Sequence, residues 1–108
     1  MKWYRELYVS DSIAGAKVNR IKWRINHRAG VVSVYVIALA SNSENQLDII
    51  PAWVLKQKAY PKKELTIVGL AKGRKDALLL VKRIVEETYR TTGDADIRSY
   101  LAGKRRPA

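Results

Sequence analysis

The pattern of hydrophobic positions along the chain predicts four β-strands. Two segments, VVSVYVIALA (31–40) and ELTIVGLA (64–71), are rich in β-branched residues and almost wholly apolar. We expect them to form two central strands that are buried on both faces. Two shorter segments, RELYVS (5–10) and QLDII (46–50), predict further strands, and Pro51 stops the second of these.

Helical spacing of apolar positions appears further along the chain and is clearest over 74–91, where Gly93 supplies the stop. Its inward stripe comprises Ala77, Leu80, Val81, Ile84 and Thr88. Asp94 is placed to cap a final short helix over 95–102, and AWVLKQKAY (52–60) predicts a short helix after Pro51.

The segment from about 12 to 28 fits two structures. As a helix it has a capping residue among Ser10, Asp11 and Ser12, and Gly30 as its stop. Its apolar stripe would be Ala14, Val18, Ile21 and Ile25. As a strand, Ile21, Trp23 and Ile25 alternate with cations. Because cap, stop and length agree, we favour the helix.

These elements predict an α+β fold, a two-layer α/β sandwich with helices at about 12–28, 74–91 and 95–102 packed on a small mixed sheet. The central strands would be 31–40 and 64–71. Residues 1–103 would form a single α/β domain, and 104–108 a basic flexible tail. The order of the strands does not follow from the sequence.

Composition narrows the possible classes of protein. The chain has 108 residues and no cysteine, which excludes a disulfide scaffold, thiolate metal sites and cysteine nucleophiles. The longest apolar run, VYVIALA, is far shorter than the ~20 residues of a membrane span. MKWYRELYVS reaches Glu6 before an apolar run forms, unlike a secretory signal. We therefore expect a cytoplasmic protein with no membrane span.

Charge is the outlying feature, with 21 Lys and Arg against 10 Asp and Glu, a net charge of +11. No acidic residue occurs from Ser12 to Ser43 or from Pro51 to Lys63. Such a balance favours a polyanionic partner: nucleic acid (DNA or RNA), an acidic protein surface or anionic lipid. Solubility alone is the plainer explanation of the charge.

The segment KVNRIKWRINHRAG (17–30) concentrates this charge around one tryptophan. On a helix, Lys17, Arg20, Arg24 and Arg28 fall in one outward stripe beside Trp23 and His27. On a strand, Arg20, Lys22, Arg24 and Arg28 share a face. Either geometry suits phosphate contacts with a base stacked on Trp23. Trp3, Tyr4, Tyr8, Trp53 and Tyr60 are expected in the core or at its rim.

A second basic group lies in the turn GLAKGRKDA (69–77), which follows the predicted strand 64–71. A helix that begins in this turn would direct free backbone N–H groups and its positive end toward a bound anion. This turn lacks the phosphate loop of nucleotide hydrolases. The predicted nucleic-acid-binding residues are Lys17, Arg20, Lys22, Trp23, Arg24, Arg28, Lys72, Arg74 and Lys75.

Catalytic signals are weak. His27 is the only histidine, with no acidic residue within fifteen positions on either side, so a hydrolytic triad is not expected. A divalent-metal nuclease would need convergent carboxylates, for which Asp48 and Glu64 are the candidates. Glu64-Leu65-Thr66 lacks the lysine of the nuclease Glu-x-Lys pattern. We expect no enzyme, no cofactor and no metal.

Three phrases, LYVSDSI, VYVIALASNSENQLDIIP and TIVGLAKGRKDALLLVKRIVEETY, carry a resemblance. They resemble a group of short uncharacterised proteins from Gram-positive, largely gut-dwelling bacteria, over most of 7–89. The resemblance implies a bacterial cytoplasmic origin and no particular site.

The sequence therefore predicts a small basic non-enzymatic bacterial protein. It would bind nucleic acid mainly through the phosphate backbone, with low sequence specificity. The alternative is a protein-interaction module or regulator that docks on an acidic partner. A divalent-metal nuclease is the remote third hypothesis.

Overall fold

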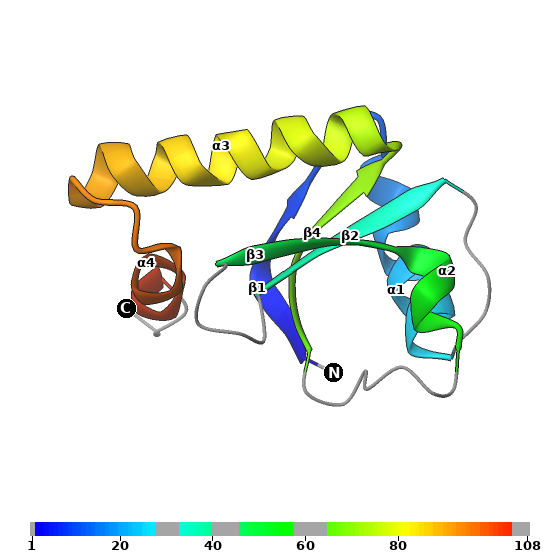
Figure 1. Ribbon diagram of the computed structural model, residues 1–108. Helices are drawn as coiled ribbons and strands as arrows, with labels where there is room; N and C mark the ends of the chain where they lie inside the picture. Colours follow the sequence, from blue (N-terminus) through cyan, green and yellow to red (C-terminus); the bar gives the residue numbers. More distant parts are fainter. Residues whose placement is uncertain (1, 28–32, 40–45, 58–64, 105–108) are drawn as a thin grey trace.

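The computed structural model describes residues 2–27, 33–39, 46–57 and 65–104. They form a four-stranded sheet with helices packed against it, so the predicted α+β fold is confirmed (Figure 1). The elements in chain order are β1 (Lys2–Val9), η1 (Gly15–Lys17, a 3₁₀ turn), α1 (Val18–Asn26), β2 (Val34–Leu39), β3 (Leu47–Pro51), α2 (Ala52–Leu55), β4 (Thr66–Lys72), α3 (Arg74–Thr92) and α4 (Ile97–Lys104).

The sheet has the order β1-β4-β2-β3 and is mixed. β1 runs parallel to β4, and β2 is antiparallel to both of its neighbours. The two predicted central strands, β2 and β4, do occupy the centre. Val36, Ile37, Ile67 and Val68 are fully buried there, as expected for strands apolar on both faces.

Helices cover both faces of this sheet. Ile21 and Ile25 of α1 and Leu55 of α2 share one core cluster with Val36 of β2. The neighbouring residue Ile37 points to the other face and joins the core under α3 and α4. The predicted sandwich of helices on a mixed sheet is therefore confirmed. Helices also cover the second face of the sheet, because the central strands β2 and β4 are apolar on both sides.

The ambiguous segment is helical, and its start differs from the prediction. Helix α1 is preceded by η1, and neither has a side-chain cap. Ser10, a predicted capping residue, instead has its hydroxyl 2.8 Å from that of Ser12 and accepts a hydrogen bond from the Lys72 N–H (3.3 Å). Ala14, a predicted inward residue, is exposed because the helix begins after it. The predicted stop, Gly30, lies outside the described residues.

Helices α3 and α4 are held to the other face by buried apolar residues and one shared carboxylate. The predicted stripe of α3 is confirmed, since Ala77, Leu80, Ile84 and Thr88 are buried and Val81 packs against them. The hydroxyls of Tyr8 and Tyr100 both donate to Glu87, and the Tyr100 bond is 2.8 Å long. One side chain of α3 thereby joins β1 to α4. The predicted basic tail was 104–108. Lys104 is the last residue of α4, and residues 105–108 lie outside the described residues.

Candidate functional site

Helix α1 presents an exposed indole ring on its solvent side. Ile21 and Ile25 are buried against the sheet, at 9% and 2% exposure. Because residues three and four apart share a helix face, Arg20, Trp23 and His27 are directed away from that core. Trp23 is 57% exposed. An indole in this position is available to a base or another flat partner.

His27 orients this indole. The two rings stack with centroids 4.2 Å apart and planes 22° apart. The imidazole Nδ1 also lies 2.8 Å from the carbonyl oxygen of Trp23, one helical turn earlier. Both contacts tie the histidine to its own helix, where it restricts the rotamers of Trp23.

The predicted cations of this segment do not share one environment. Lys17 and Arg20 are exposed, whereas Lys22 and Arg24 are half-buried. The ammonium of Lys22 lies 5.3 Å from the ring centroid of Trp3, on the side of α1 facing β1. Arg28 lies outside the described residues. The structure therefore exposes Lys17 and Arg20, sets Arg20 three residues from Trp23 on the same side of α1, and directs Lys22 toward Trp3.

Helix α2 adds a second exposed indole that the sequence did not predict. Trp53 was expected in the core or at its rim, but it is 59% exposed. In this single turn, Ala52 and Leu55 take the buried positions, so Trp53 is left outside. Lys56 follows it and is exposed. The lysines that follow Trp53 were the signal available in the sequence; Lys58, Lys62 and Lys63 lie outside the described residues.

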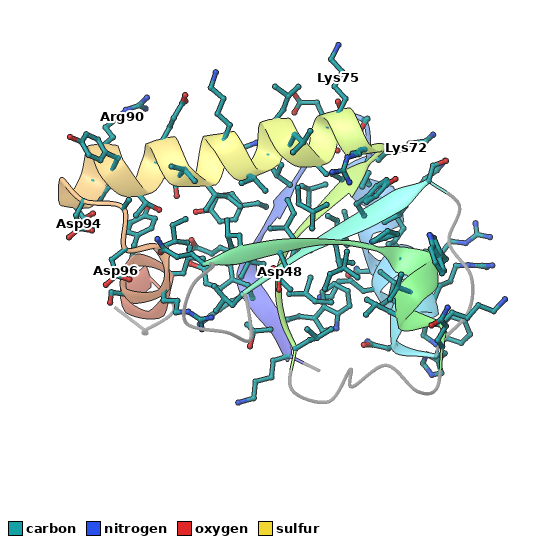
Figure 2. The ribbon with its side chains drawn as sticks, in the orientation of Figure 1. Asp48, Lys72, Lys75, Arg90, Asp94 and Asp96 are labelled. Carbon is teal, nitrogen blue, oxygen red and sulfur yellow. The ribbon has the colours of Figure 1, made fainter. Side chains whose placement is uncertain are left out.

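Helices α1 and α2, each taken from one of the two acid-free stretches, pack on the same face of the sheet. Helix α1 lies within Ser12–Ser43 and α2 within Pro51–Lys63, and both pack into the same core cluster. We call their solvent side, together with the turn η1 before α1, the α1–α2 face; its exposed cations and indoles are Lys17, Arg20, Trp23, Trp53 and Lys56. The two helices themselves contribute no carboxylate to it. Asp48 projects from β3 well to one side of both helices (Figure 2).

The second predicted group, Lys72, Arg74 and Lys75, is exposed at the start of α3. Figure 2 shows Lys72 and Lys75 projecting at this end of the sheet. Gly73 stands before the helix with φ +86°, a conformation that favours glycine, and no side chain caps the helix. The uncapped amides and the three cations suit an anion.

Two acidic side chains lie near this second basic group and offset part of its positive charge. Adjacent parallel strands whose following helices lie on opposite faces leave a crevice beyond their carboxyl ends. β1 and β4 are such a pair, and a cavity of about 150 Å³ lies there. Its lining consists of Ser10, Asp11, Asp76, Leu79, Leu80 and Arg83. With two carboxylates and one guanidinium in its lining, this end of the sheet is less complementary to phosphate than the α1–α2 face.

Of the two residues suggested for a nuclease, the structure describes one. Asp48 is half-buried on the edge strand β3, and Glu64 lies outside the described residues. Among residues 2–27, 33–39, 46–57 and 65–104, no three acidic or histidine side chains are grouped so as to hold a metal ion. In the same part of the chain, no helix is long and apolar enough to cross a membrane.

Comparison with family models, curated proteins and solved structures finds no match to this chain. Its function is therefore inferred from the charge, exposure and geometry described above.

Proposed function

We propose that this chain is a non-enzymatic cytoplasmic protein that binds nucleic acid through the phosphate backbone, with little sequence specificity. The observation that carries the proposal is the α1–α2 face, where exposed cations lie beside two exposed indoles on helices without a carboxylate. Cations at such a surface displace the counterions condensed on a phosphate chain, which supplies affinity that is independent of sequence. Lys72, Arg74 and Lys75 would add secondary contacts.

Charge on the α1–α2 face is tested by a double variant and a matched control. Lys17→Ala with Arg20→Ala removes two exposed cations from this face. Lys82→Ala with Arg90→Ala removes two exposed cations from α3, on the other side of the sheet. Both variants lose the same net charge from different faces; in the control, Lys82→Ala also removes the ion pair of Lys82 with Glu86 (3.9 Å). Affinity for mixed-sequence DNA and RNA is measured by fluorescence anisotropy over a salt series.

The proposal predicts that binding weakens steeply with salt. The slope of log K against log salt should be shallower in the α1–α2 variant by about 0.7 for each lost contact on single strands, or about 0.9 on duplexes. The α3 control should keep the wild-type slope. Absence of binding at low salt, or equal losses in both variants, contradicts the proposal. Absence of binding would favour an acidic protein partner.

The non-enzymatic part of the proposal has its own test. A labelled oligonucleotide incubated with the protein and Mg²⁺ should be recovered uncut. Cleavage that disappears in Asp48→Ala would contradict this part and restore the nuclease hypothesis.

A further inference from the structure

We infer that the α1–α2 face selects single-stranded nucleic acid over duplex, with Trp23 and Trp53 as stacking platforms for unpaired bases. This inference rests on the proposed function and goes further, because it names the form of nucleic acid that the face prefers. It is carried by the exposure of the two indoles, by the packing of both helices on one core cluster, and by the exposed cations of the same face.

Trp23 has a ring that is both exposed and already oriented. His27 covers it at 4.2 Å between centroids, and that histidine is fixed in turn at the backbone of Trp23. A side chain that is ordered before binding loses less conformational freedom when a partner stacks on it. The arrangement therefore favours stacking of a flat group against Trp23.

Trp53 is exposed on α2 and does not contribute to the packing of this helix on the core. Ala52 and Leu55 hold α2 to the core at 4% and 0% exposure, while Trp53 is 59% exposed. Trp3 shows the contrast within the same chain: it is half-buried against this core, and its indole N–H donates to Asn26 (3.0 Å). Of the three tryptophans, the two outward ones are those on the α1–α2 face.

A stacking surface distinguishes single strands from duplexes. In a duplex the bases are stacked on one another, and only their edges are presented in the grooves. In a single strand each base offers a free π-face, and stacking on an aromatic side chain is tolerant of sequence. Cations alone would favour the duplex, which has the denser phosphate charge. A preference for single strands is therefore the property that the two indoles add to the charge of Lys17, Arg20 and Lys56.

The test compares three probes on five proteins. The probes are short fluorescein-labelled oligonucleotides of mixed sequence: single-stranded DNA, single-stranded RNA and duplex DNA. The proteins are the wild type, Trp23→Ala, Trp53→Ala, the double variant, and Tyr89→Ala as control. Tyr89 is a 63% exposed aromatic residue on α3, on the other side of the sheet. Circular dichroism and the thermal midpoint establish that each variant is folded.

Wild type should bind the single strands more tightly than the duplex. Each tryptophan variant should lose about 5-fold to 150-fold in affinity for single strands, while its duplex affinity is unchanged. Tyr89→Ala should behave as wild type with every probe. In the wild type, single strands should quench tryptophan fluorescence, and the double variant should lose that quenching. The DNA and RNA arms show which of the two sugars is preferred.

Two failures are distinguishable. If wild type binds the duplex at least as tightly as the single strands, or the tryptophan variants bind single strands as wild type does, the single-strand inference is overturned while the proposed function stands. If wild type binds none of the three probes at low salt, the proposed function fails and the inference fails with it.

Discussion

Trp23 and His27 illustrate how much of this surface is decided by single side chains. On the outside of α1, the imidazole of His27 stacks on the indole of Trp23, and its Nδ1 lies 2.8 Å from the backbone oxygen of Trp23. The sequence placed His27 beside Trp23 on a helix, but it did not show that the rings would stack. Side-chain rotamers of exposed residues depend on neighbours one turn away, which spacing alone does not specify.

We predict that His27→Ala weakens binding of single-stranded DNA about 2-fold to 12-fold, because the freed Trp23 must then be ordered on binding. The change is measured by fluorescence anisotropy, with all variants compared at the same pH and the same salt concentration. His27→Phe is the matched control, since it keeps a flat ring against the indole and should retain most of the affinity. Equal losses in the two variants would contradict a positioning role.

At the scale of elements, the sequence predicted those that have a strong period and missed features set by contacts across the fold. The stripe of α3 and the apolar runs of β2 and β4 were sufficient to place them. The parallel pairing of β1 with β4 joins segments more than fifty residues apart and leaves no local signal. Trp53 is exposed because Ala52 and Leu55 take the buried positions of α2, and the period of so short a segment does not determine that choice.

Gly69 of β4 lies where β1 and α3 pack closely against this strand. A Cβ atom at this position of β4 would lie 3.2 Å from Cδ2 of Leu80 and 3.3 Å from the backbone oxygen of Tyr8. Gly69→Val should therefore lower the free energy of unfolding by about 1–3 kcal/mol, measured by urea denaturation. Gly15→Ala is the control, because a Cβ there meets nothing within 4 Å. If both substitutions have the same small effect, α3 does not pack as closely on β4 as described.

Helix α4 should loosen in acid. Hydrogen bonds from the side chain and backbone of Ser99 hold the pKa of Asp96 below its ordinary value of 3.8. A carboxyl group with a lowered pKa in the folded state stabilises that state above its ordinary pKa, and this stabilisation is lost as pH falls through the lowered value. Amide exchange in Ile97–Lys104 should therefore rise below pH 3.8.

The control for α4 is Asp96→Ala, which removes the carboxylate at every pH. Its α4 amides should exchange faster than those of the wild type at neutral pH, while those of α3 stay as they are. Acid-dependent exchange in α4 that persists unchanged in this variant would show that another group is responsible.

For the whole molecule, the net charge of +11 matters less than how the fold distributes it. Helices α1 and α2, which belong to two acid-free segments separated in sequence, pack on one side of the sheet over one core cluster. The acidic residues Asp94 and Asp96 lie far from that side, beyond the end of α3 (Figure 2). The sequence indicated a basic surface, but the joining of α1 with α2 follows from topology, which spacing does not show.

The central claim is that the α1–α2 face binds nucleic acid, and it is tested most directly by mapping the contact on ¹⁵N-labelled protein. The amide spectrum is recorded while a short single-stranded oligonucleotide is added. Shifts should concentrate in residues 17–27 and 52–57, with the indole N–H signals of Trp23 and Trp53 among the largest. Shifts concentrated on the solvent side of α3, or a spectrum that does not change at low salt, would contradict the claim.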